Sequence, residues 1–239
     1  METVVNKQLQ NHLLNNKLIS SRQSGLRPHH SIADLLTILA QTGNASLDRS
    51  EEVCIVACDI KGAFDRVWHN GLLAKLRTKG VSGMLLTWLR SYLHGSIRGP
   101  FLFSVFIDDL VDACENQLYL YADDSTLFAP IRSVNERASV FTNLNRDLEK
   151  MRVWAAKWKV AFEPTKCKAL MLSRKRMPAI PDLYFGNTKL AVETELSILG
   201  IAVDSNISKN AGQRLDTAEE QLSTKLKSVA LWNVPVCHG

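Results

Sequence analysis

The chain has 239 residues, 46% hydrophobic and 22% charged, which suits one large globular domain or two small ones. Its net charge of +5 favours a polyanionic partner such as nucleic acid without establishing one. The five cysteines include no CxxC pair, which argues against a disulfide framework and a zinc site. No apolar run is long enough to cross a bilayer, and the polar N-terminus is no signal peptide. We therefore expect a nuclear or cytoplasmic protein with no membrane partner.

The first half of the chain predicts helices around one buried strand. Residues 1–17 show helical apolar spacing, and a polar turn follows over 20–28. Ser31 is expected to cap a second helix, with Asp34 completing a capping box, and 41–52 is expected to be a polar loop. The sequence VCIVACDI (53–60) predicts a strand buried on both faces. Helical patterns follow at 70–79 and 82–93.

The second half of the chain adds hairpins and one long helix. After an apolar segment at 101–110, the string LYLYADDSTLFA (118–129) predicts a hairpin. Apolar residues between 141 and 158 then mark one stripe of a long amphipathic helix. Strands are expected at 169–172 and 196–203, a hairpin at 183–192, and a helix at about 211–231. The absence of a regular βαβ repeat indicates an α+β fold with a mostly antiparallel sheet.

Three aspartates stand at the ends of predicted strands. Asp59 ends the buried strand, and Asp123 and Asp124 form the hairpin tip. A charge there costs free energy unless it is paired or bound to a metal. If the strands are neighbours, the carboxylates converge in a way that suits Mg²⁺. The structural alternative is that Asp123-Asp124 is an ordinary turn pair and Asp59 caps the following turn.

Longer strings around these aspartates resemble a known family. CDIKGAFDRVWH (58–69) and YADDSTLF (121–128) are similar to the two metal-binding motifs of reverse transcriptases, the first in its non-LTR retrotransposon version. Four further strings match in the family's order: SRQSGLRPHHSIADLL (21–36), GSIRGPFLFSVFIDDL (95–110), WKVAFEPTKCKALMLS (158–173) and LSILGIAVD (196–204). The resemblance covers nearly the whole chain, and six ordered matches argue against convergence.

The resemblance implies a right-hand polymerase and its reaction. The fold would be fingers and palm over residues 1–203, with an antiparallel palm sheet, followed by a truncated start of the thumb or connection over 204–239. The activity would be RNA-directed DNA synthesis by two-metal nucleotidyl transfer, with Mg²⁺ or alternatively Mn²⁺. The implied partners are an RNA template, a DNA primer and dNTPs, whereas the oligomeric state is not indicated.

The same resemblance implies residue roles at the reaction centre. Asp59 and Asp123 match the principal metal ligands, Asp124 the third carboxylate, and the carbonyl of Ile60 would complete one metal shell. Lys166 matches the general acid that protonates pyrophosphate. Its alternative is membership of a basic cluster that holds backbone phosphates.

Further matches concern substrate contacts. Phe64 resembles the steric gate against a ribose 2′-hydroxyl, Arg27 a contact to the triphosphate, and Gly95 part of a motif beside template and nucleotide. The alternatives are a core phenylalanine and a solvated arginine. The string LSILGIAVD resembles the primer-grip hairpin of the family. The implied nucleic-acid contacts are basic residues and the Leu-Gly pair of this string: Lys168, Arg174, Lys175, Arg176, Leu199 and Gly200.

The sequence also departs from the family pattern. The hairpin that normally precedes the motif at Gly95 is absent, and His94 and Arg98 replace a glutamine and an aliphatic residue. The chain begins inside a family helix, ends soon after the thumb begins, and carries neither an endonuclease domain nor a Cys/His knuckle. These departures predict little polymerase activity. Two interpretations therefore stay open: a polymerase domain with a working metal site, or a decayed, inactive fragment that at most binds nucleic acid.

Overall fold

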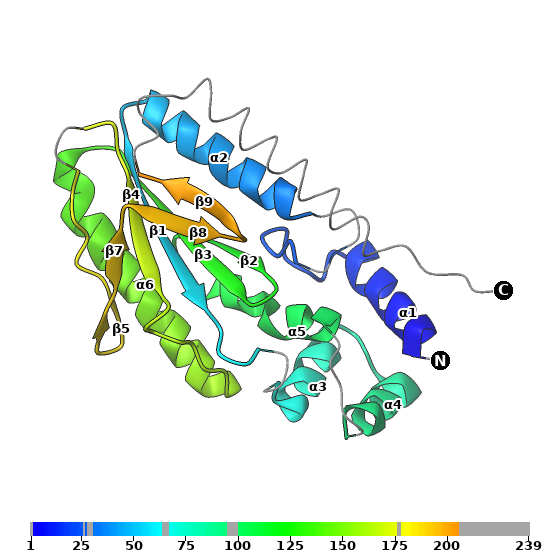
Figure 1. Ribbon diagram of the computed structural model, residues 1–239. Coiled ribbons are helices and arrows are strands. Elements are labelled where there is room, and N and C mark those ends of the chain that lie inside the picture. Colours follow the sequence, from blue (N-terminus) through cyan, green and yellow to red (C-terminus); the bar gives the residue numbers. More distant parts are fainter. Residues whose placement is uncertain are drawn as a thin grey trace.

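A five-stranded sheet forms the centre of the computed structural model, which describes residues 2–25, 27, 31–63, 67–94, 100–175 and 178–205 (Figure 1). The strand order is β2-β3-β1-β4-β7. Their bounds are β1 Glu52–Asp59, β2 Gln117–Tyr121, β3 Asp124–Ile131, β4 Lys168–Leu172 and β7 Ala191–Glu193. All pairings are antiparallel except that of β4 with β7. The predicted mostly antiparallel α+β fold is therefore confirmed.

Two small hairpins accompany this sheet. β5 (Tyr184–Phe185) and β6 (Thr188–Lys189) form the predicted hairpin around Gly186. β8 (Glu195–Ile198) and β9 (Ile201–Asp204) form a second one, although the apolar pattern predicted a single strand over 196–203. The single strand was wrong because Leu199 and Gly200 both adopt positive φ, at 52° and 78°, and reverse the chain.

The alternation of side chains along β1 divides the core into two layers. Cys54, Val56 and Cys58 point into the larger cluster, whereas Val53 and Ile55 point into the smaller one. The larger cluster lies among α1 (Glu2–Asn15), α3 (His69–Thr78), α4 (Gly83–His94), α5 (Pro100–Ile107) and α6 (Arg137–Trp158). The smaller cluster lies under α2 (Ile32–Asp48) and the β8–β9 hairpin. Burial on both faces explains why β1 reads as a continuous apolar run.

The beginning of α2 agrees with the sequence, and its end does not. Ser31 and Asp34 form the predicted capping box. The polar loop predicted over 41–52 is wrong, because α2 continues through Asp48. Gly43 and Leu47 are buried on this stretch, and Gly43 faces Leu172 of β4. Tertiary burial thus overrides the weak helix propensity of the polar residues.

Shorter elements complete the description. Residues Asp108–Asp112 form the 3₁₀ helix η1 directly after α5, and Val134–Glu136 form η2 before α6. None of the helices in the described ranges is both long and apolar enough to span a membrane. The helix predicted over 211–231 and nearly all of the predicted thumb lie outside the described residues.

Candidate active site

The aspartates at the strand ends meet at one end of the sheet. In the antiparallel register of β1 and β3, Asp59 lies directly opposite Asp124. Asp124 in turn pairs with Tyr121 across the β2–β3 hairpin, whose turn contains Ala122 and Asp123. Residues opposite each other project to the same face of a sheet, so the carboxylates of Asp59 and Asp124 share a face. The condition that the sequence left open, that these two strands are neighbours, is met.

Asp59 is held by the segment that leads into β4. The side chain of Lys166 donates a hydrogen bond of 3.0 Å from Nζ to Asp59 Oδ2. The backbone of Asp59 accepts a 3.0 Å hydrogen bond from the amide of Glu163, and Lys61 donates to the carbonyl of Ala161 at 2.8 Å. Main-chain bonds therefore fix the residues on both sides of Ile60. Two predicted catalytic residues, 107 positions apart in sequence, are thereby in direct contact.

The charges at this end of the sheet perturb one another. Desolvation, followed by the negative charges of Asp123 and Asp59, raises the pKa of Asp124 to about 6, although the residue remains exposed. The hydrogen bond to Asp59, followed by its charge, raises the pKa of Lys166. Mutual repulsion among three carboxylates is the situation that a bound cation relieves.

The carboxylates are near one another but do not form a ready-made metal cage. Across the described ranges of the chain, no three His, Cys, Asp or Glu side chains are grouped closely enough to hold a metal ion. Asp59 instead bonds to Lys166. The donor set still fits Mg²⁺, which binds through one or two carboxylates and takes its other oxygens from water and substrate phosphate.

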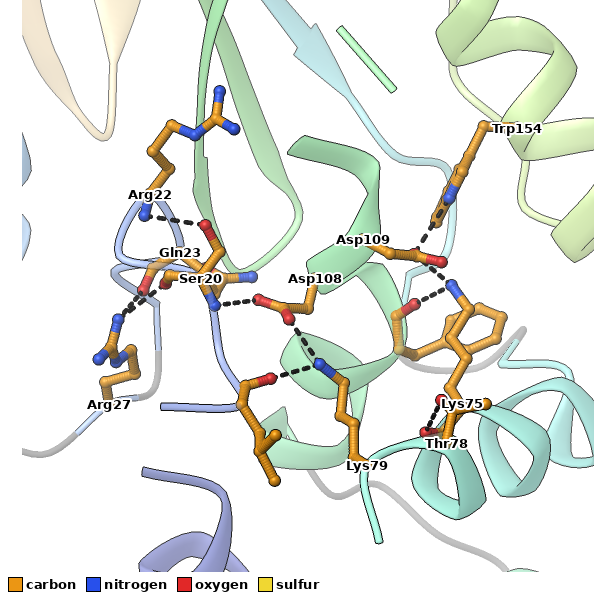
Figure 2. Close-up of polar contacts among 12 residues, drawn as sticks. Ser20, Arg22, Gln23, Arg27, Lys75, Thr78, Lys79, Asp108, Asp109 and Trp154 are labelled. Carbon is orange, nitrogen blue, oxygen red and sulfur yellow. Dashed lines mark hydrogen bonds and ion pairs between the residues drawn. The ribbon is translucent and has the colours of Figure 1, made fainter. Parts of the chain in front are cut away.

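Arg27 belongs to a segment beside the hairpin tip. Its guanidinium donates from Nη1 to the carbonyls of Ser20 and Gln23, at 2.8 and 3.1 Å (Figure 2). Arg27 Nε and Gln23 Nε2 are buried and lack a hydrogen-bond partner in the described structure. Arg27 therefore organises its own loop, and a triphosphate contact stays a prediction.

The structure divides the predicted basic cluster between the two ends of the sheet. Lys168 lies at the Asp59 end and pairs with Glu193 at 3.1 Å. Arg174 and Lys175 follow the other end of β4, where they pair with Asp48 at 3.1 Å and Glu52 at 3.2 Å. A single phosphate-binding patch made of all these residues is not present in the described part of the chain.

The remaining predicted site residues have the following places. Leu199 and Gly200 form the turn of the β8–β9 hairpin, in agreement with the resemblance to the primer grip. The side chain of Ile60 is buried, and a metal contact from its carbonyl stays a prediction. Phe64, Gly95 and Arg176 lie outside the described residues, as does the departure from the family pattern at Arg98; the side chain of His94 is likewise not described.

The sequence analysis missed a second acidic pair, Asp108 and Asp109. Asp108 Oδ2 pairs with Lys79 Nζ at 2.8 Å, and Asp109 Oδ1 pairs with Lys75 Nζ at 2.5 Å (Figure 2). Lys75 is buried and also lies 3.8 Å from the ring centroid of Trp158. Burial outweighs the attraction of Asp109 and lowers the pKa of Lys75 to about 8. The available signal was the spacing of Lys75 and Lys79, four residues apart, which places Lys79 at the C-cap of α3 on the side of the helix that carries Lys75.

A mostly antiparallel sheet with aspartates converging at one end defines the class of fold, and comparison with known families identifies it. Residues 1–203 match the family described as reverse transcriptase (RNA-dependent DNA polymerase). Because this match covers most of the chain, the chain belongs to the reverse transcriptase family.

Relatives specify the branch of this family. The chain is 25% identical over 241 residues to a probable RNA-directed DNA polymerase from transposon BS of Drosophila melanogaster, covering 86% of this chain and 26% of the relative. It is 25% identical over 223 residues to the RNA-directed DNA polymerase from mobile element jockey of the same organism, covering 80% and 24%. The chain thus spans about a quarter of the length of these relatives. The predicted resemblance to non-LTR retrotransposon reverse transcriptases is confirmed.

Solved structures confirm the fold independently. An apo telomerase from Candida tropicalis, truncated from its C-terminal domain, superposes with a TM-score of 0.55 at 12% identity over 85% of this chain and 44% of that chain. Telomerase from Candida albicans in complex with a telomeric RNA fragment gives 0.53 at 13% identity, over 85% and 37%. At these identities the likeness concerns the fold, which is the predicted fingers and palm.

Proposed function

We propose that this chain catalyses RNA-templated DNA synthesis at the end of the sheet that carries Asp59, Asp123 and Asp124. The observation that supports this most directly is the pairing of Asp59 with Asp124 beside the hairpin tip, with Lys166 at 3.0 Å. Like charges that lie opposite each other on neighbouring strands, with a third carboxylate at the adjacent turn, cost free energy unless they bind a ligand. The substrates would be dNTPs, a DNA primer and an RNA template.

The three carboxylates would hold two divalent cations, Mg²⁺ or alternatively Mn²⁺. Bound there, such ions activate the primer 3′-hydroxyl and stabilise the leaving pyrophosphate. Lys166 would donate its proton to the pyrophosphate oxygen, and its hydrogen bond to Asp59 holds the ammonium at the site. Leu199 and Gly200 at the β8–β9 turn would contact the primer, Lys168 the nucleic-acid backbone, Arg27 the triphosphate and Phe64 the sugar.

Primer extension on an RNA template with Mg²⁺ and dNTPs tests this function. Because of the departures from the family pattern, we expect only weak extension by the unaltered chain, and we expect Asp123→Asn to abolish what remains. Asp182→Asn is the control, because this exposed carboxylate pairs with Lys189 in another part of the chain. Retained activity in Asp123→Asn would contradict the assignment. An unaltered chain that binds RNA but extends no primer would instead be an inactive nucleic-acid-binding fragment. The altered motif around Gly95 is the observation that favours this second interpretation.

A further inference from the structure

The segment from Ser20 to Gly25 lies along the outer edge of β2 and ends at the hairpin tip. The amide of Ser24 donates to the carbonyl of Leu120 at 2.9 Å, and the amide of Leu120 donates to the carbonyl of Arg22 at 2.9 Å. The segment thereby adds a short parallel extension to the sheet. It runs beside the strand that leads into Ala122 and Asp123.

Gly25 fits against the turn with no space for a side chain. A Cβ atom on Gly25 would lie 2.2 Å from the amide nitrogen of Ala122 and 3.0 Å from the carbonyl carbon of Tyr121. Ala122 itself has a φ of 53°, in the left-handed region that alanine rarely adopts. Surrounding structure has to enforce such a conformation, and Gly25 is the backbone in contact with it.

Asp108 holds the start of this segment in place. Its Oδ1 accepts a 2.8 Å hydrogen bond from the amide of Ser20, and its Oδ2 pairs with Lys79 at 2.8 Å (Figure 2). Lys79 also donates to the carbonyl of Leu18. The side chain of Asp108 is only 7% exposed. Both carboxylate oxygens are thus engaged, and η1 and α3 together fix the chain where it enters the segment.

We propose that Asp108 is a positioning residue for the carboxylates of the hairpin tip. It acts through segment 20–25, whose far end contacts Ala122 immediately before Asp123 and Asp124. This inference rests on the function proposed above, since it assigns the tip a divalent cation. Asp108 contacts Ser20 and Lys79, and it reaches the reacting groups only through the segment. Its removal lets the segment shift, which releases the left-handed turn and spreads the metal ligands.

Asp109 provides a matched control one residue further along η1. Like Asp108, it forms an ion pair with a lysine of α3, Lys75, at 2.5 Å. Its other hydrogen bond comes from Trp154 of α6 at 3.1 Å, which leads away from segment 20–25 (Figure 2). Asp108→Asn and Asp109→Asn therefore both remove a carboxylate from a lysine, but only the first loosens the segment.

The test measures Mn²⁺ binding to the full chain by electron paramagnetic resonance, without nucleotide or primer. We expect Asp108→Asn to weaken Mn²⁺ affinity about tenfold, in the range for residues that support a metal ligand. Asp109→Asn should stay within about twofold of the unaltered chain. Equal weakening in both variants, or none in Asp108→Asn, would overturn the proposal, as would an unaltered chain that binds no Mn²⁺.

Amide hydrogen exchange gives a second readout that needs no metal. Exchange at Ser24 and Leu120 should quicken in Asp108→Asn and remain unchanged in Asp109→Asn. If Asp108→Asn does not fold, Gly25→Ala replaces it, because it displaces the same segment from the other end and should weaken Mn²⁺ binding similarly. A chain that shows this pattern yet extends no primer would contradict the proposed polymerase function and leave the positioning role intact.

Discussion

Lys166 and Asp59 form an exposed pair that contributes little to stability and to which we assign a proposed catalytic use. The side chains are 67% and 29% exposed, and such pairs contribute little to folding. Their contact holds the ammonium of Lys166 beside the carboxylates, and it raises the pKa of the lysine. An ammonium in this place is suited to the proposed protonation of a leaving phosphate oxygen.

We predict that Lys166→Met lowers the rate of nucleotide addition by about a hundredfold or more. Lys166→Arg should remain low, because arginine keeps the charge but holds its proton too tightly to act as an acid. Single-turnover primer extension at saturating dNTP measures the rate. Lys189→Met is the control, since Lys189 is 63% exposed and pairs with Asp182 at 2.7 Å. Full activity in Lys166→Arg would show that only the charge matters.

Single residues also mark the limit of the sequence analysis. Asp59, Asp123 and Lys166 could be predicted together because each belongs to a motif with its own local pattern. Arg174 and Lys175 were grouped with Lys166 because they are close in sequence. β4 lies between them and carries the chain roughly 3.3 Å per residue away from the site. Which end of a strand a residue reaches depends on pairing, which local composition does not encode.

At the scale of elements, β1 links two charged ends of the sheet. Asp59 lies at one end, and Glu52, fully buried, lies at the other. Glu52 accepts hydrogen bonds from Arg137 at 2.7 Å, Ser173 at 2.9 Å and Lys175 at 3.2 Å. Burial raises the pKa of Glu52, but these three donors outweigh it, so the pKa is lowered from 4.5. This carboxylate joins β1 to the start of α6 and the end of β4.

We predict that Glu52→Gln lowers the free energy of unfolding by about 2 kcal/mol at pH 7, because it removes the buried carboxylate from the half-buried Arg137 and Lys175. Since the folded pKa is below the unfolded one, this contribution is present above about pH 4.5 and is lost as the pH falls through the folded value. Urea unfolding from pH 7 to pH 3 should therefore show a smaller acid loss in Glu52→Gln. Glu149→Gln, an exposed pair with Arg152, should change stability by less than about 0.5 kcal/mol. Equal acid loss in both variants would contradict this role.

Elements with strong local signals could be predicted, and those that depend on tertiary contacts could not. The capping box of Ser31 and the apolar run of β1 carry their own pattern, and both are where the sequence placed them. The last turns of α2 are stabilised by Leu47, which is buried in the smaller core cluster. The polar residues around it therefore predicted a loop where the structure has a helix. Apolar residues lie on both sides of the turn at Leu199 and Gly200. The sequence therefore reads as one continuous apolar run, and its pattern does not indicate the turn.

At the scale of the whole molecule, the sheet separates the end that carries the aspartates from the end that carries Glu52. Strand β1 spans roughly 23 Å between Asp59 and Glu52, at about 3.3 Å per residue. Lysines and arginines at both ends pair with acidic residues, but Lys166 and Lys168 at the first end are 67% and 45% exposed, against 42% and 33% for Arg174 and Lys175 at the second. The basic side chains at the aspartate end are therefore the more accessible to a polyanion.

We predict salt-sensitive binding of an RNA–DNA duplex, with the logarithm of affinity falling linearly with the logarithm of salt concentration. Lys168→Ala should reduce the magnitude of this slope by about 1, as expected when one phosphate contact is lost. Lys175→Met should leave the slope unchanged, because Lys175 pairs with the fully buried Glu52, whereas the partner of Lys168, Glu193, is 37% exposed. Fluorescence anisotropy between about 50 and 200 mM salt measures both. A salt-independent affinity, or equal slopes for Lys168→Ala and the unaltered chain, would contradict this assignment.

The pairing of segment 20–25 with β2 has a consequence for self-association. β2 is the outermost strand on its side of the sheet, and an uncovered edge offers amides and carbonyls to a strand from another molecule. Leu120, next to the last residue of β2, has both its amide and its carbonyl occupied by the segment. On the opposite side, the edge strand β7 has only three residues. Both borders thus discourage edge-to-edge addition, which protects a sheet with an apolar centre from aggregation.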